Sequence, residues 1–262
     1  MNVPVAGLRY NLDLLYELTK KELKVRYKSS VLGYLWSVLN PLAMALVFYV
    51  GLGVILKVQG RAGRPYWLML IGGLFPWQWF SNSVNASTHV YVANANLIRK
   101  VPFRRGLLPL ATVLNDLLHF LASLPVIAVC LAIAHLAPSW AWLWGVPLLA
   151  TAQLLLVYGV GLVVGGLNLF FRDLGNLVSI LVQMLFYLSP VVYELKWIEQ
   201  PALRRAILAN PLTPLLEAWR GLLLDGRLDW AAAAWSLAGG AAVLAVGLLV
   251  HARLRDKLAE AA

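Results

Sequence analysis

Asp116 and His119 are a pair of side chains that could do acid–base chemistry, because they lie three residues apart within a long apolar segment. Residues at this spacing share one face of a helix, and an ionisable group inside a membrane is by default a functional residue. A proton relay through the pair would make the chain a proton-coupled secondary transporter. Alternatively, the pair belongs to a polar cluster that bonds a neighbouring helix, at about 0.6–2 kcal/mol per interhelical hydrogen bond. The adjacent Asn115 favours the polar cluster.

A second group of side chains with a possible chemical role is cationic. The sequence LIRKVPFRRGLL at residues 97–108 surrounds a Val-Pro-Phe core with Arg99, Lys100, Arg104 and Arg105, and apolar stretches lie on both sides. Basic residues near the end of a membrane span are retained in the cytoplasm, which explains the four charges. It does not explain the apolar core between them.

Motifs for other chemistries are absent from the sequence. No Gly-Lys dipeptide occurs, so the chain has no P-loop of the G-x-x-x-x-G-K-S/T kind and cannot be its own ATPase by that route. There is no Gly-x-Ser-x-Gly elbow of a hydrolase. The histidines lack metal-ligand spacing; they are His89, His119, His135 and His251. We therefore expect a non-enzymatic chain that binds no metal and carries no cofactor of its own.

The composition requires that these residues be positioned by membrane helices. Hydrophobic residues make up 61% of the 262 residues and only 13% are charged, and the mean hydropathy is +0.73. A chain of this length cannot hide so much apolar surface inside a water-soluble globule. Because no soluble stretch is long enough to form a second core, we expect a single transmembrane domain over residues 1–262.

A helix needs about 20 apolar residues to cross the roughly 30 Å hydrocarbon layer of a membrane, and six segments meet this need. The segment from Tyr66 is polar in its second half, and Asn176–Val192 is short and ends at Ser189-Pro190. Such stretches are tolerated at membrane depth only where they face other helices or water. We therefore predict an all-α polytopic membrane protein with six transmembrane helices, of which the clear ones are Leu35–Leu56, Leu107–Ala137, Leu143–Phe171 and Trp230–Val250.

The distribution of Lys and Arg among the connections predicts the orientation of the chain. Fourteen of them lie before the first span, in the 97–108 stretch, in the FRDLGN turn and in the C-terminal tail, whereas the other connections carry eight. Five of those eight, between Tyr193 and Asp229, are offset by five acidic residues. Both termini and the 97–108 stretch are therefore predicted to be cytoplasmic. Lys57, Arg61 and Arg64, which follow the first span, run against this orientation.

The net charge of +10 fits contact with anionic lipid headgroups and with pyrophosphate-linked substrates. The basic residues lie at span ends rather than on one groove-sized face. Nucleic acid is therefore not an expected partner.

The N-terminal segment, residues 1–33, is predicted to be a cytoplasmic helix in the lipid interface. Its apolar residues recur at steps of three and four, and charged residues cover the remaining surface, a pattern typical of interfacial amphipathic helices. The pattern fits an anchor to membrane lipids and a contact for a partner equally well. The apolar positions and their threonine neighbour are Leu8, Leu12, Leu15, Tyr16, Thr19, Leu23 and Tyr27.

The connection between the fifth and sixth spans, residues 193–229, contains two short apolar pieces. Ala202–Leu208 and Pro214–Leu224 are separated by Asn210-Pro211 and Thr213-Pro214. Neither piece is long enough to span a membrane, and both lengths fit short interfacial or re-entrant helices. We therefore predict an external gate loop that dips back into the outer leaflet.

Several stretches, taken together and in order, resemble the membrane subunit of type 2 ABC exporters for polysaccharides and polyol phosphates, such as carriers of O-antigen, capsule or teichoic acid. The resemblance covers nearly the whole chain and rests on RYKSSVLGYLWSVLNPL (26–42), LIRKVPFRR (97–105), FRDLGNLV (171–178) and NPLTPLLEAWRGLLLDG (210–226).

This resemblance implies a permease of the bacterial inner membrane that forms a homodimer, binds two separate ATPase subunits and exports a lipid-linked glycan. ATP and Mg would be bound by the partner ATPase. An exporter of small drugs or lipids with the same architecture is the alternative within the class. The proton-coupled transporter remains the alternative from another class.

The resemblance also implies roles for individual residues. Residues 97–106 would be a coupling helix that docks into the ATPase, with Arg and Lys pairing to acidic rims while Val101 and Phe103 fill a pocket. Its residues are Ile98, Arg99, Lys100, Val101, Pro102, Phe103, Arg104 and Arg105.

Aromatic side chains of spans one and five would line a path between two copies of the chain, since aromatic faces can stack on sugar rings. Tyr34 and Trp36 have an equally good role as interfacial anchors. The candidate path residues are Tyr34, Trp36, Phe48, Tyr49, Phe186 and Tyr187.

Overall fold

The structure is a computed structural model that describes residues 7–26, 30, 32–60, 63–171 and 173–254. All regular elements in these ranges are helical, which confirms the predicted all-α class. The α-helices are α1 (Leu8–Arg26), α2 (Trp36–Phe48), α3 (Tyr66–Ala93), α4 (Ala95–Lys100), α5 (Leu107–Ile133), α6 (Trp142–Asn168), α7 (Leu174–Leu188), α8 (Pro201–Leu208), α9 (Leu212–Asp225) and α10 (Trp230–Leu254).

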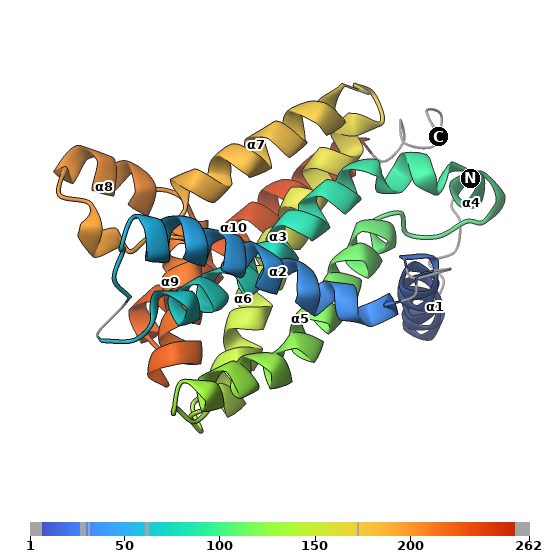
Figure 1. The fold of residues 1–262 in the computed structure, drawn as a ribbon. Coiled ribbons are helices and arrows are strands. Elements are labelled where there is room, and N and C mark those ends of the chain that lie inside the picture. Colours follow the sequence, from blue (N-terminus) through green and yellow to red (C-terminus); the bar gives the residue numbers. More distant parts are fainter. Residues whose placement is uncertain (1–6, 27–29, 31, 61–62, 172, 255–262) are drawn as a thin grey trace.

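The connections alternate between the two ends of one helix bundle (Figure 1). One end, called here the α4 end, holds α1, α4, the turn between α6 and α7 and the last turn of α10. The opposite end, the α8 end, holds α8 and the α2–α3 and α5–α6 connections. The segments that carry the larger share of Lys and Arg thus lie together. Some residues used in the sequence patterns lie outside the described residues, namely Tyr27, Lys28, Arg61, Arg172, Arg255 and Lys257.

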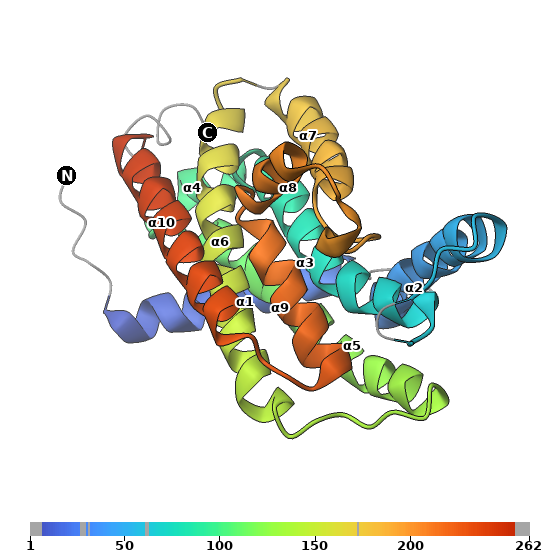
Figure 2. The ribbon, with the colours of Figure 1, turned by 90° about the vertical axis from the view of Figure 1, so that its left-hand side faces the viewer.

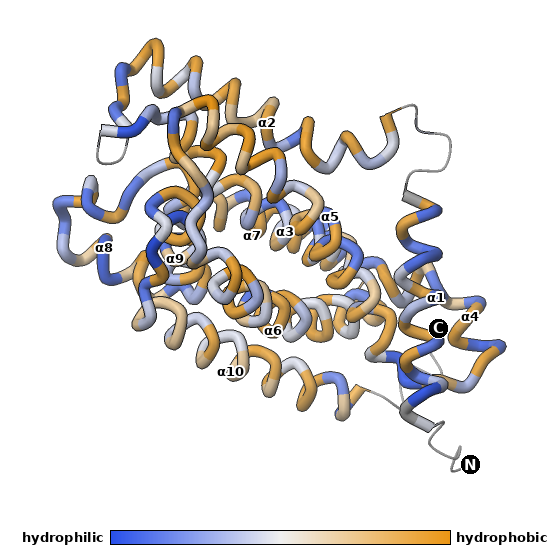
Figure 3. Tube along the Cα trace, turned by 90° about the horizontal axis from the view of Figure 1, so that it is seen from below, coloured by the Kyte–Doolittle hydropathy of each residue, from blue (hydrophilic) through white to orange (hydrophobic). Residues whose placement is uncertain are grey.

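Hydrophobic residues run along the bundle, and hydrophilic residues gather at its two ends (Figure 3). In the described ranges, four helical segments are long and apolar enough to cross a membrane: Gly33–Ile55, Leu107–Ile133, Trp142–Asn168 and Trp230–Leu254. They match the four clear segments of the sequence, so the chain is a multi-pass membrane protein.

α3 and α7 are the less typical members of the bundle. α3 has 28 residues but is more polar in its second half, and α7 has 15 residues. A helix as short as α7 rises about 1.5 Å per residue and falls short of the roughly 30 Å hydrocarbon layer. Both run between the same two ends as the longer helices (Figures 1 and 2). The total of six spans therefore stays a prediction.

The first span begins earlier than its α-helix. Gly33–Leu35 forms a 3₁₀ turn that leads directly into α2, and Tyr49–Ile55 continues α2 as a π-helical segment. The predicted interfacial segment 1–33 is thus too long at its C-terminal end, because Gly33 already belongs to the first span. Within the described residues, the interfacial helix is α1, Leu8–Arg26.

α1 has two apolar sides. Leu18 is buried with Ile98 and Leu108, where α1 packs on the bundle, whereas Leu12 and Tyr16 are 54% and 64% exposed. The inner side fixes α1 to the bundle, and the outer side is suited to a lipid interface.

Small residues allow the bundle helices to approach closely. A Cβ at Gly247 of α10 would lie 2.5 Å from the carbonyl oxygen of Gly159 in α6, and one at Gly165 would lie 2.6 Å from the carbonyl oxygen of Ser87 in α3. Only glycine permits such contacts between backbones. These glycines therefore serve packing within one chain.

The connection between α7 and α10 forms the two short helices that the sequence predicts. α8 is exposed apart from Ile207, whereas α9 is packed among α3, α6 and α10 (Figure 2). Trp219 and Leu222 of α9 are completely buried. α9 therefore re-enters the bundle and forms part of its core near the α8 end.

Candidate functional site

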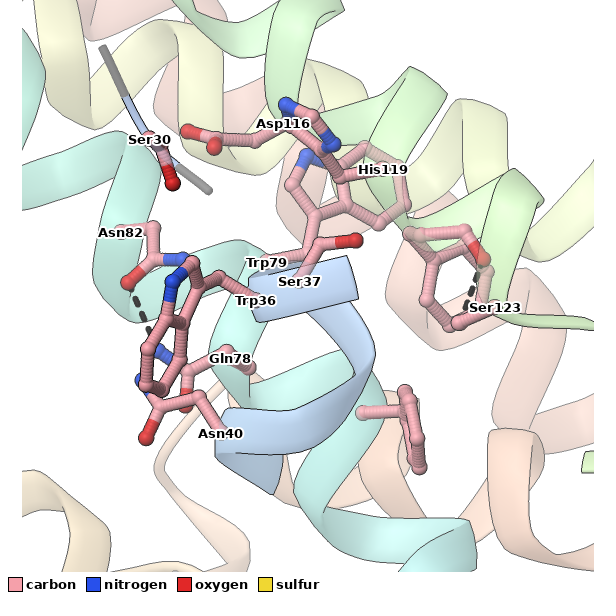
Figure 4. A pocket seen from close by; sticks show the side chains of 12 residues that line it. Ser30, Trp36, Ser37, Asn40, Gln78, Trp79, Asn82, Asp116, His119 and Ser123 are labelled. Carbon is pink, nitrogen blue, oxygen red and sulfur yellow. Dashed lines mark hydrogen bonds between the residues drawn. The ribbon is translucent and has the colours of Figure 1, made fainter. Parts of the chain in front are cut away.

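A polar pocket of about 340 Å³ lies between α2, α3 and α5 (Figure 4). It brings together side chains from three helices that lie far apart in the sequence. The lining residues are Ser30, Trp36, Ser37, Asn40, Phe75, Gln78, Trp79, Asn82, Asp116, His119, Phe120 and Ser123.

Helical periodicity explains why these residues face one space. The α3 residues Phe75, Gln78, Trp79 and Asn82 follow the spacing i, i+3, i+4, i+7, which places them along one face over two turns. The α5 residues follow the same spacing, from Asp116 to Ser123. The sequence identified Asp116, His119 and Trp36 but missed the amides on α2 and α3. The shared spacing on α3 is the signal that could have identified Gln78 and Asn82.

Asp116 and His119 are buried in the wall of the pocket, at 2% and 7% exposure. Asp116 Oδ2 accepts a hydrogen bond of 2.8 Å from Ser83 Oγ of α3. The His119 ring lies 5.8 Å from the ring of Tyr34, centroid to centroid. Asp116 thus bonds a neighbouring helix, which is the structural role that the sequence favoured for the pair. Its role as a proton relay stays a prediction.

The floor of the pocket is an aromatic stack. Trp79 stacks on Phe120 with ring centroids 5.4 Å apart, and Phe120 meets the edge of Trp219 at 4.8 Å. Trp219 Nε1 donates to Gln153 Oε1 at 2.7 Å, and Gln153 Nε2 donates to the Pro76 carbonyl at 2.8 Å. Helices α3, α5, α6 and α9 are thereby tied together beneath the pocket.

The predicted coupling segment is only partly helical. α4 ends at Lys100, and Val101 is extended, with φ −127° and ψ 126°. Pro102 is the physical reason, because the residue before a proline is disfavoured in the helical region. The expectation of a helix over residues 97–106 is corrected to α4, Ala95–Lys100, followed by an extended Val101, an irregular stretch over residues 102–104 and a turn at Arg105–Gly106.

The coupling segment is anchored to the chain's own core. Ile98 is 8% exposed and Phe103 is half-buried against a cluster that contains Ile98, Tyr91 and Leu108. Val101 and Arg105 are also half-buried. The exposed residues of the segment are Arg99, Lys100, Pro102 and Arg104.

Hydrogen bonds connect this segment to its neighbours. Lys21 Nζ of α1 donates to Asn94 Oδ1 at 2.7 Å, at the corner between α3 and α4. Tyr158 of α6 donates to the Gly106 carbonyl at 3.2 Å. A movement of the segment would therefore be passed to α1, α3, α5 and α6.

The candidate path residues fall into two groups. Tyr34 and Trp36 are 58% and 53% exposed, and Tyr187 is 60% exposed. Phe186 is 7% exposed, and its ring lies 5.4 Å from that of Phe48. Tyr49 is half-buried in the π-helical segment. The structure brings Phe48 and Phe186 together inside one copy of the chain, and the role of the group in a path stays a prediction.

A buried arginine holds the elements of the α8 end in place. Arg220 of α9 is completely buried; its Nη2 donates to the carbonyls of Pro190 at 2.6 Å and Val191 at 3.0 Å. Its Nη1 donates to Glu217 Oε1 at 2.7 Å and to the Tyr193 carbonyl at 3.4 Å. We call this set the Arg220 clamp. Burial raises the pKa of the Tyr193 phenol beside it, against the opposite effect of Arg220.

The connection after the first span is held against the same region. Arg64 Nη1 forms an ion pair of 2.9 Å with Asp225 Oδ1, and the Tyr66 hydroxyl donates to the Val192 carbonyl at 2.6 Å. Arg64, one of the basic residues that ran against the predicted orientation, thus has an acidic partner at the α8 end. Within the described ranges, no group of three His, Cys, Asp or Glu side chains is placed to hold a metal ion.

Comparison with known families decides the class of the chain. Residues 13–224 match the sequence model of the family described as "ABC-2 type transporter", a match that spans well over half of the chain. The chain belongs to the ABC-2 type transporter family. This membership confirms the resemblance that the sequence stretches indicated.

Similar proteins extend the comparison over nearly the full chain. A protein from Klebsiella pneumoniae named "O-antigen export system permease protein RfbA" is 41% identical over 97% of this chain and 96% of its own length. A protein of the same name from Myxococcus xanthus is 32% identical over 88% of each chain. The "Polysialic acid transport protein KpsM" of Escherichia coli is 25% identical over 80% of each chain.

In this ABC-2 protein, the pocket, the coupling segment and the Arg220 clamp lie at different positions along the length of a single helical bundle. The coupling segment lies at the α4 end, and the Arg220 clamp holds elements of the α8 end. The pocket lies between them, because its floor contacts Trp219 of α9 while its wall includes residues at the start of the first span.

Proposed function

We propose that the chain is the transmembrane subunit of an ATP-driven exporter that moves lipid-linked polysaccharide, an O-antigen or similar cell-surface glycan, out of the cytoplasm. It acts as a homodimer in a bacterial inner membrane, with both termini in the cytoplasm and two separate ATPase subunits that bind ATP and Mg. The observation that carries this proposal is the 41% identity to an O-antigen export permease over 97% of this chain and 96% of the relative.

The α4 end supports the proposed coupling to an ATPase. Lys100, Pro102 and Arg104 are exposed there, while Ile98 and Phe103 anchor the segment to the bundle. The exposed cations suit an acidic surface on a partner, and the anchor passes a push on the segment to the helices behind it. Alternating access would follow from differential binding of the two ATPase states to two arrangements of the bundle.

An exporter of small drugs or lipids is the second candidate, because it would share this architecture. The names of the relatives favour a polymer, since both RfbA proteins are named for O-antigen and KpsM for polysialic acid. A proton-coupled mechanism has less support, because Asp116 is engaged with Ser83 in the packing of α3 on α5.

In-frame deletion of the coding sequence in the native host tests the proposed function. We expect polysaccharide to disappear from the cell surface and to accumulate inside the cell, and plasmid-borne chain to restore export. Surface and intracellular polymer are measured by fractionation and gel electrophoresis. Unchanged surface polymer, together with increased sensitivity to small toxic compounds, would favour the second candidate.

A further inference from the structure

We propose that the pocket between α2, α3 and α5 binds one or two uncharged sugar units of the polymer as it passes the membrane. This inference rests on the proposed function, since it names the part of the substrate that the pocket takes. The pocket is lined by residues of a single copy of the chain and so differs from a path between two copies.

The polar groups of the pocket match sugar hydroxyls. Three amides, those of Asn40, Gln78 and Asn82, point toward the same space with Ser37 (Figure 4). Gln78 Nε2 donates to Asn82 Oδ1 at 2.7 Å, which orients both amides and leaves a carbonyl on one and an NH₂ on the other. A sugar hydroxyl both donates and accepts, so a wall with both kinds of group suits it.

Trp36 provides an aromatic surface beside these amides. It lines the pocket and is 53% exposed. The C–H face of a sugar ring packs on such an amphipathic aromatic side chain, and one stacked ring fixes the orientation without requiring a tight bond. An aromatic face beside amide groups is a more specific feature than an interfacial anchor needs, which was the other role that the sequence allowed for Trp36.

The charge of the pocket argues for a neutral ligand. None of the described residues that line it is Lys or Arg, and Asp116 contributes a carboxylate to its wall. A phosphate or pyrophosphate would find no permanently charged cation among these residues, since the titratable side chains of the lining are Asp116 and His119. The hydrophilic residues of the described chain gather instead at the ends of the bundle (Figure 3).

The volume of the pocket and the aromatic side chains beneath it suit brief binding of successive small units of a polymer. Its volume of about 340 Å³ is at the lower end of the range of about 300–1,000 Å³ for small-ligand sites, which fits about one or two sugar rings. The stack of Trp79, Phe120 and Trp219 supports the pocket from below, so its shape is set before a ligand arrives.

Photo-cross-linking in living cells tests the pocket. Trp36→p-benzoylphenylalanine keeps an aromatic group at the pocket, and Trp235→p-benzoylphenylalanine is the matched control, since Trp235 of α10 is 74% exposed elsewhere on the bundle. We expect light to attach the polymer to position 36 and not to position 235. The adduct should be absent from cells that cannot synthesise the polymer.

A second pair of variants distinguishes an effect on the pocket from an effect on the fold. Asn82→Leu removes a pocket amide, whereas Asn85→Leu makes the same change three residues later, where Asn85 accepts a hydrogen bond from Ser179 of α7. Loss of one or two hydrogen bonds of about 1 kcal/mol each corresponds to at least about a fivefold loss. We expect this loss in adduct yield and polymer export for Asn82→Leu, with chain abundance unchanged, and less than about a twofold change for Asn85→Leu.

The outcomes distinguish this inference from the function on which it rests. If the deletion strain loses surface polymer but position 36 yields no adduct, the pocket inference fails and the exporter stands. An adduct that persists in polymer-deficient cells would identify a lipid as the occupant and overturn the inference. If the deletion strain keeps its surface polymer, the proposed function itself fails.

Discussion

Arg220→Met is expected to destabilise the chain by about 3 kcal/mol, the lower end of the range for a broken buried ion pair, because Arg220 is completely buried whereas its partner Glu217 is 22% exposed. The guanidinium also donates to the carbonyls of Pro190 and Val191, and methionine leaves both without that donor. A fully buried cation that satisfies several groups at once is costly to remove. The loss is measured as the lowered midpoint of thermal unfolding of the purified chain in a fixed detergent.

Two further variants make this result specific. Arg205→Met removes an exposed arginine of α8 and should change stability by less than about 0.5 kcal/mol. Arg220→Met combined with Glu217→Gln should regain part of the loss, because the unpaired carboxylate is gone. An unfolding midpoint for Arg220→Met equal to that of the unaltered chain would show that the Arg220 clamp does not hold the elements of the α8 end.

Reversal of two charges on the coupling segment, Lys100→Glu with Arg104→Glu, is expected to lower co-purification of the ATPase subunit at least about tenfold. Like charges brought together across an interface cost several kcal/mol, and about 1.4 kcal/mol is already tenfold in affinity. Both side chains are exposed, so the fold should be unaffected. Phe103 is a poorer target, since it packs on the chain's own cluster. The measurement is the amount of ATPase recovered with the tagged chain in mild detergent.

The control for this experiment is an equal change of charge on a neighbouring element. Lys20→Glu with Lys24→Glu alters two exposed lysines of α1 and adds the same negative charge at the α4 end. If the two double variants lose the ATPase equally, net charge rather than the coupling segment determines association. If neither loses it, the segment does not dock the ATPase.

Much of the fold follows from local properties of the sequence. Apolar length identified the four clear spans, and the short pieces between Pro-containing turns became α8 and α9 within one or two residues. These features depend on the hydrophobicity of consecutive residues and on the positions of proline, and both can be read from short stretches of the sequence. The coupling segment was predicted too long, although Pro102 was visible, because the family resemblance implied one helix over residues 97–106, across a residue that ends helices.

The site was less predictable because it depends on how helices face one another. Asp116 and His119 could be singled out as rare ionisable residues, whereas Asn40 and Gln78 are ordinary amides until α2 and α3 meet α5. Arg220 was counted among the charges of an external connection, yet it lies at the centre of α9 with its guanidinium on the turn after α7. The periodicity of side chains indicates which residues share one face of a helix, but it does not indicate which other helix packs against that face.

Transport by the purified complex in proteoliposomes is the most direct measurement of the energy source. Lipid-linked polysaccharide supplied on the ATPase-bearing side should be moved across the membrane when ATP and Mg are added, and a proton gradient alone should move none. The account predicts that transport stops when the ATPase subunit is omitted. Export driven by a proton gradient without the ATPase would contradict it.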